Sequence, residues 1–152
     1  MHRFIITVLA VPIVLLGQTY TGEKHSSIAR ADWTSVGSGK HEFSGDTLTL
    51  SGTDYTMYQR VPGNFELVCK ATLKSDVRGD GGGLIARESM ADGSRYHSNL
   101  LLVSKRGFAI REDCWLGHKT QEYGSGGQQT MWLKLVRWNN IITAYHSRDG
   151  KS

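Results

Sequence analysis

The chain is poor in cysteine and proline, with two of each among 152 residues. Cys69 and Cys114 are too few for the disulfide framework of small cysteine-rich secreted proteins, and two cysteines so far apart match no zinc motif. The six histidines are dispersed and contain no HExxH pattern. Two interpretations of the cysteines stay open: a Cys69–Cys114 disulfide, or two separate, small hydrophobic side chains.

Long apolar runs are also scarce, and the clearest one lies near the N-terminus at residues 4–16. This run follows His2 and Arg3 and precedes small and polar residues. It is shorter than the ~20 apolar residues that a membrane-spanning helix needs, so residues 1–19 are predicted to be a cleaved secretory signal peptide. We therefore expect a secreted, periplasmic or cell-envelope protein without a membrane span in its mature chain. Residues 20–31 are polar and are predicted to be a flexible lead-in.

Charge of one sign does not form blocks anywhere in the chain. The formal net charge is +4, and it falls to +3 without Arg3, the charged residue of the predicted signal peptide. The basic residues are scattered among strands and turns, as on a solvated surface. Nucleic acid is therefore not an expected partner.

Helical periodicity is missing from the mature chain, whereas alternation with a period of two recurs. It is clearest over residues 65–73 and 131–138, and Asn139-Asn140 then predicts a two-residue turn into a returning strand. Residues 75–83 and 117–130 are predicted loops, and the glycines of the first are attributed to positive φ. Strands are predicted at residues 33–36, 41–43, 47–51, 55–61, 65–73, 84–89, 96–104, 108–115, 131–138 and 141–147. The pattern predicts one all-β, antiparallel domain over residues 32–152.

Several blocks carry a resemblance to a known fold: GLIARES at residues 83–89, DGSRY at 92–96, WLKLVR at 132–137, TAY at 143–145 and SRDG at 147–150. In their order and spacing they resemble the concanavalin A-like lectin/glucanase superfamily, in particular bacterial secreted domains of unknown function related to laminin-G-like jelly rolls. The resemblance implies an antiparallel two-sheet jelly-roll sandwich with one curved sheet. It also implies strands beyond Asp149-Gly150, so the sandwich is expected to lack its last strands. A shorter block, GNFEL at 63–67, is similar to keto-disaccharide hydrolase domains.

The leading functional hypothesis is a non-catalytic module that recognises carbohydrate or envelope glycan on the curved sheet. Such a site needs an aromatic platform and planar polar groups that bind hydroxyls. Alternation places Arg87 and Arg111 where they could line one face. For each aromatic residue considered singly, the alternative is a position in the hydrophobic core, and that alternative is favoured. The candidate ligand-binding residues are Arg87, Glu88, His97, Arg111 and Trp115.

Two other functions remain as alternatives. A glycoside hydrolase, keto-disaccharide hydrolase-like or glucanase-like, would use Glu88 with Glu112 or Asp113 as its catalytic carboxylates. Glu112 and Asp113 are adjacent and therefore face opposite sides of a strand. The third possibility is a structural or protein-interaction module whose open sheet edge pairs with a strand-donating partner or a second copy of the chain.

Metal binding has one weak candidate in the sequence. Asp76 and Asp80 lie in a glycine-rich loop of the kind that supplies calcium ligands in the superfamily that the chain resembles. Two aspartates fall short of a ligand set. No other cofactor is expected.

Overall fold

A computed structural model of the chain describes residues 3–10, 13–20, 33–44, 47–91, 94–114, 121–124 and 128–151. These residues form antiparallel strands and contain no helix, which confirms the all-β prediction. No described helix is therefore long and apolar enough to cross a membrane. The strands are β1 (Arg3–Ala10), β2 (Ile13–Tyr20), β3 (Thr34–Ser44), β4 (Thr47–Pro62), β5 (Phe65–Leu73), β6 (Gly81–Arg87), β7 (Tyr96–Ser104), β8 (Gly107–Cys114), β9 (Gln121–Gly124), β10 (Thr130–Trp138) and β11 (Ile141–Ser147).

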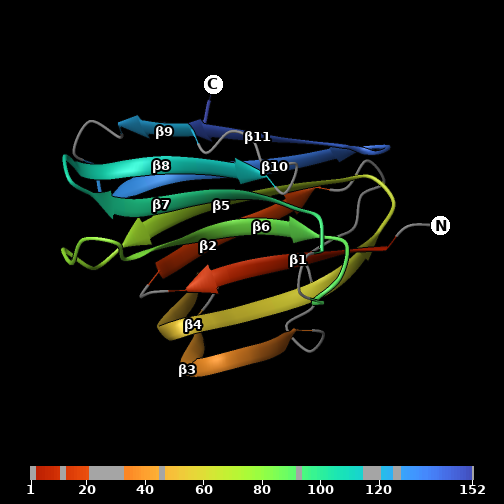
Figure 1. Cartoon of the computed structure of the whole chain (residues 1–152), viewed down its shortest axis with the longest axis horizontal. Coiled ribbons are helices and arrows are strands. Elements are labelled where there is room, and N and C mark those ends of the chain that lie inside the picture. The colour runs from red at the N-terminus through yellow and green to blue at the C-terminus, as the bar shows by residue number, and fades with distance from the viewer. Residues whose placement is uncertain are drawn as a thin grey trace.

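The strands belong to one hydrogen-bonded sheet in the order β11-β10-β5-β2-β4-β1-β6-β7-β8-β9, with β3 paired to β4. The sheet bends, so that β10 and β11 lie against β6 and β7 (Figure 1). The end strands β9 and β11 also approach each other, and the rings of Tyr123 and His146 are 5.0 Å apart. The bend gives the sheet an inner and an outer face.

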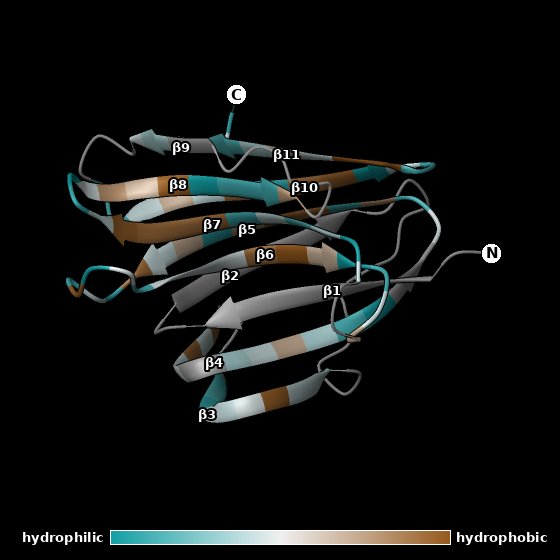
Figure 2. Cartoon of the chain, viewed as in Figure 1, coloured by the Kyte–Doolittle hydropathy of each residue, from teal (hydrophilic) through white to brown (hydrophobic). Residues whose placement is uncertain are grey.

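Alternating side chains fill the space inside the bend. Along β5, every second residue from Phe65 to Leu73 is buried, and β10 shows the same pattern. Cys69 pairs with Leu133 in register, so the two apolar rows share the inner face. On the opposite side, β6 presents an apolar middle section and β7 an apolar second half (Figure 2). The core residues there are Leu84, Ala86, Leu101, Val103 and Ile110.

Most predicted strands are present, but some boundaries and one loop were wrong. The predicted strands at 47–51 and 55–61 are parts of the single strand β4. β9 lies inside the predicted loop at 117–130 and pairs with β8, with Ala109 opposite Gly124. The four residues of β9 show no apolar alternation, so the sequence pattern did not predict this strand. Main-chain hydrogen bonds to the neighbouring strand hold it in the sheet.

The glycines after Asp80 are extended and belong to β6, contrary to the predicted loop over residues 75–83. Of the glycines in that loop, Gly79 has a positive φ, of 96°. Gly83 is required for packing: a Cβ atom there would overlap the Asn99 carbonyl oxygen and lie 2.9 Å from Leu133 Cδ1. Positive φ therefore explains one glycine of the loop, and close packing explains another.

The hairpin of β10 and β11 has the predicted two-residue turn, with Trp138 paired to Ile141. Of its two asparagines, Asn139 adopts positive φ, at 55°. The buried Arg137 donates from Nε to the Asn139 carbonyl and from Nη1 to the Gly63 carbonyl, both at 2.9 Å. Its guanidinium thus joins this turn to the one before β5.

The residues predicted to be a signal peptide form β1 and β2 in this structure. β1 lies between β4 and β6, and β2 lies between β4 and β5. Cleavage of residues 1–19 stays a prediction. Of the predicted flexible lead-in at residues 20–31, Tyr20 is the last residue of β2, and the rest lies outside the described residues.

Candidate binding surfaces

Arg87 and Arg111 lie on the outer face of β6, β7 and β8. Arg87 pairs in register with Tyr96, and Arg111 pairs with Leu100, four residues further along β7. Between them, the Tyr96 hydroxyl donates to Asp113 Oδ2 at 3.0 Å. Partial burial, the hydrogen bond and the Asp113 charge raise the pKa of Tyr96, so its hydroxyl remains a donor. This face carries polar groups, but no exposed aromatic platform adjoins them among the described residues of these strands.

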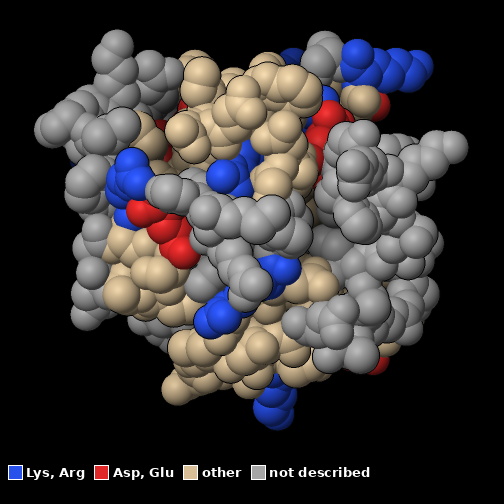
Figure 3. All heavy atoms as spheres, turned by 90° about the vertical axis from the view of Figure 1, so that its right-hand side faces the viewer, with Lys and Arg blue, Asp and Glu red and all other residues tan. Residues whose placement is uncertain are grey.

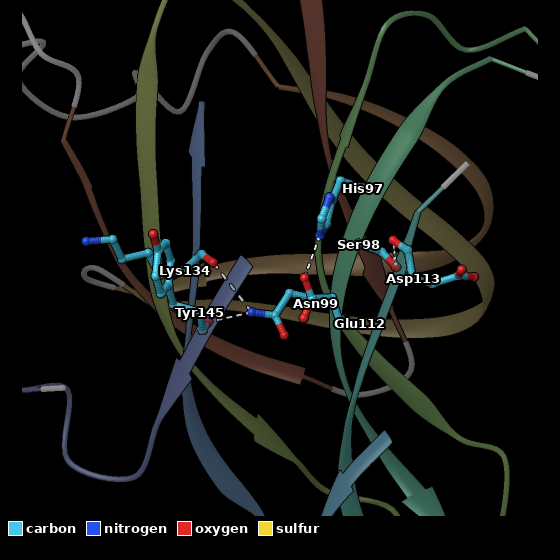
Figure 4. Close-up of polar contacts among 7 residues, drawn as sticks. All are labelled: His97, Ser98, Asn99, Glu112, Asp113, Lys134 and Tyr145. Carbon is cyan, nitrogen blue, oxygen red and sulfur yellow. Dashed lines mark hydrogen bonds and ion pairs between the residues drawn. The ribbon is translucent and has the colours of Figure 1, made fainter. Parts of the chain in front are cut away.

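His97 projects to the inner side of the same strands, opposite to the two arginines. Its Nε2 atom is 2.9 Å from Glu112 Oε1, and the two side chains are 16% and 27% exposed. Beside them, the buried Asn99 donates from Nδ2 to the Tyr145 carbonyl at 2.6 Å (Figure 4). The Asn99 Oδ1 atom has no hydrogen-bond partner in the described part of the chain. The candidate ligand-binding residues are thus divided between two faces.

The structure does not bring together the candidate catalytic residues Glu88 and Glu112. Glu88 forms an ion pair with Arg95, whereas Glu112 contacts His97. Glu112 pairs in register with Asn99, and Asn99 pairs with Leu84 on β6. Leu84 lies four residues before Glu88 in the sequence. Four residues of extended strand span ~13 Å, well beyond the ~5–5.5 Å of a retaining carboxylate pair. Asp113 faces the other side of β8, as predicted, and contacts Tyr96.

The remaining candidate residues are Trp115, the calcium candidate Asp80 and the two cysteines. Trp115 lies outside the described residues. Asp80 accepts a hydrogen bond from the Ser75 hydroxyl, and no cluster of three or more His, Cys, Asp or Glu side chains suited to a metal ion occurs in the described ranges. Cys69 and Cys114 are both free thiols in this structure. Burial raises the pKa of the Cys69 thiol, and a hydrogen bond with the Leu133 main chain offsets only part of that effect.

A row of aromatic side chains on the outer face of β10 and β11 is more exposed than the sequence suggested. We call Trp132, Trp138, Ile141 and Tyr145 the aromatic strip. Trp138, Ile141 and Tyr145 are 64%, 68% and 49% exposed. The favoured assignment of aromatic residues to the core was therefore wrong for Trp138 and Tyr145. The alternation of β10 contained the signal, since it places both tryptophans opposite the buried leucines.

Charged groups accompany the aromatic strip. Lys134 pairs with Tyr145 in register, and its Nζ atom lies 5.7 Å from the centre of the Tyr145 ring. The same Nζ atom is 2.8 Å from Glu66 Oε1 on β5. Trp132, diagonal to Tyr145, packs under Gly150, where a Cβ atom would be 2.8 Å from the indole ring. The strip thus combines exposed ring faces with an ammonium group and a carboxylate.

No protein-family model matches this sequence, and comparisons with curated proteins and with solved structures likewise found no match.

Proposed function

We propose that the protein is an exported, non-catalytic module that binds carbohydrate or envelope glycan along the aromatic strip. We further propose that its antiparallel fold is a jelly-roll sandwich of the concanavalin A-like type. The observation that carries the functional proposal is the exposure of Trp138 and Tyr145 on one outward face with Lys134. The proposed site therefore lies on β10 and β11, away from the arginines that the sequence had favoured.

The chemistry of the strip suits a neutral or weakly charged saccharide. Flat aromatic rings stack on the apolar face of a sugar ring, and charged side chains bind its hydroxyls. Lys134 and Glu66 are each 35% exposed, so their remaining hydrogen-bonding capacity is open to solvent. Trp132 and Trp138 are six residues apart, ~20 Å along an extended strand. A row of that length favours several units of a chain over one monosaccharide.

The arrangement of carboxylates supports binding over hydrolysis. Glu88 and Glu112 lie at different positions along the strands, and each contacts its own cationic or ionisable partner. A retaining mechanism would need both groups on either side of one glycosidic bond. Beside the aromatic strip, the Glu66 carboxylate is held in an ion pair with Lys134.

A glycan array followed by calorimetry tests the proposal. We expect saturable binding of an oligosaccharide, and we expect Trp138→Ala and Tyr145→Ala each to weaken it at least about tenfold, since buried aromatic anchors dominate such contacts. Val77→Ala is the control, because Val77 is 60% exposed on a loop away from the strip. The proposal fails if the folded protein binds no glycan, or if the two aromatic variants bind as tightly as the control.

A further inference from the structure

A pocket of about 810 Å³ lies beside the turn between β7 and β8, on a different part of the molecule from the aromatic strip. Figure 1 shows this turn and the loop between β5 and β6 at the same end of the fold, on the left. The volume is in the range of small-ligand sites. Its lining includes Arg78, Lys105, Arg106 and Arg111 together with the apolar Leu102 and Ala109.

The described lining contains four cationic side chains and no carboxylate, and one of the four, Arg111, stands opposite Glu122 in the register of β8 and β9. Arg78, Lys105 and Arg106 are exposed, and their side chains form no ion pair or hydrogen bond with any other described residue. These three like charges around one concave surface raise each other's electrostatic free energy, and a bound anion would lower it. On the face that Figure 3 displays, the described Lys and Arg side chains are scattered, and some of them stand beside Asp or Glu.

Main-chain hydrogen bonds hold the cationic turns in place. Gly79 N donates to the Val103 carbonyl at 2.9 Å, and Val103 N donates to the Asp80 carbonyl at 2.8 Å, so the loop that carries Arg78 is fixed to the end of β7. On the adjacent turn, Arg106 N donates to Ser104 Oγ at 3.1 Å. The nearest carboxylate in that loop, Asp80, accepts from Ser75 and does not line the pocket.

The floor of the pocket is apolar. Leu102 and Ala109 lie on the outer face of β7 and β8, and they are only 6% and 2% exposed. Figure 2 shows how β8 changes from hydrophobic in its first half to hydrophilic in its second half. Charges above an apolar floor are less screened by solvent, which strengthens their attraction for an anion.

We infer that this pocket binds a multivalent oxyanion of the phosphate or sulfate type. Guanidinium groups bind such anions with two parallel hydrogen bonds, and Arg78, Arg106 and Arg111 supply three of them. The oxyanion can belong to a small molecule or to a charged polymer. The inference does not depend on the proposed glycan site, because the two surfaces share no residue.

The test uses tripolyphosphate as the small-molecule probe and dextran sulfate as the polymer probe, with uncharged dextran as a reference. Calorimetry on the folded protein should show saturable binding of at least one anionic probe that weakens as salt increases. The triple variant Arg78→Gln, Lys105→Gln, Arg106→Gln should lose at least about tenfold in affinity. Binding of tripolyphosphate alone would identify a small ligand, and binding of dextran sulfate alone would identify a polymer.

A second triple variant, Lys40→Gln, Arg60→Gln, Arg148→Gln, removes the same number of positive charges from surfaces outside the pocket. Lys40, Arg60 and Arg148 are exposed and do not line the pocket. Their replacement by glutamine should leave the affinity within about twofold of that of the unmodified protein. Equal losses in both variants would mean unspecific attraction to a basic protein and would overturn the inference. Absence of binding to both anionic probes would overturn it as well, whereas loss of glycan binding alone would affect only the proposed function.

Discussion

Asn99 on β7 donates a hydrogen bond to the main-chain carbonyl of Tyr145 on β11, at 2.6 Å, and so joins the two halves of the bent sheet. Figure 4 shows the Asn99 amide reaching across the interior to this carbonyl. The side chain of Tyr145 points the other way, into the aromatic strip. A buried amide in the core therefore fixes the backbone position of a residue in the proposed glycan site.

Replacing Asn99 should destabilise the fold and weaken the proposed site. We expect Asn99→Ala to lower the free energy of unfolding by about 1–3 kcal/mol, because the Tyr145 carbonyl loses its buried side-chain donor. Asn99→Asp should cost more, since it places a carboxylate against carbonyl oxygens. Urea unfolding measures both changes. Asn140→Ala is the matched control on the exposed hairpin turn, and an equal effect there would contradict the assigned role.

Gly83 should tolerate no side chain. Gly83→Ala would place a Cβ atom against the Asn99 carbonyl and 2.9 Å from Leu133 Cδ1, so we expect a loss of about 1–3 kcal/mol in unfolding free energy. Gly124 offers a matched control in a strand, because a Cβ atom there meets nothing within 4 Å. Gly124→Ala should change stability by less than about 0.5 kcal/mol. Thermal unfolding of both variants decides the comparison, and equal melting temperatures would refute the packing role.

The sequence predicted strands well wherever one face is buried and the other is solvated. β5, β7 and the β10–β11 hairpin were located to within a residue or two, because burial imposes a period of two on their side chains. β9 was missed because its four residues show no apolar alternation, although they pair with β8 through the main chain. The start of β6 was missed because its glycines serve close packing, which single-sequence patterns do not distinguish from turn formation.

The candidate sites were harder to predict than the strands. The alternation did place Arg87 and Arg111 on one face, but the separation of Glu88 from Glu112 depends on the register of three strands. The basic pocket depends on two turns that meet in space although Arg78 and Lys105 are far apart in sequence. Register and turn proximity are tertiary properties, so no local pattern could reveal either arrangement.

The two cysteines should react very differently with thiol reagents. Cys69 is 3% exposed and burial raises the pKa of its thiol, so it should resist alkylation by iodoacetamide until the protein unfolds. Cys114, which is partly exposed, should be labelled in the native protein. Peptide mass mapping without reductant measures both reactions. If neither residue is labelled until a reductant is added, a disulfide is present and the assignment of free thiols is wrong.

The same buried thiol should make stability depend on alkaline pH. In the unfolded chain the Cys69 thiol ionises near its ordinary pKa of about 8.5, whereas in the folded chain it stays protonated because burial raises its pKa. The unfolded state therefore binds fewer protons above that pH, and the free energy of unfolding should decrease as pH rises beyond about 9. Cys69→Ala removes this contribution, so its unfolding free energy should fall less steeply between pH 8 and about 10. Parallel slopes for the two proteins would contradict the effect.

Removal of residues 1–19 should leave three strands with newly exposed edges. β1 lies between β4 and β6, and β2 lies between β4 and β5. Without them, β4, β5 and β6 lose these neighbours. Unpaired edges recruit other strands, so we expect the shortened chain to unfold at a lower denaturant concentration and to associate into dimers or larger species. Size-exclusion chromatography and urea unfolding of the full and shortened chains measure this, after intact-mass analysis of exported protein has located any cleavage. A shortened chain that is monomeric and equally stable would show that neither β1 nor β2 contributes to the fold.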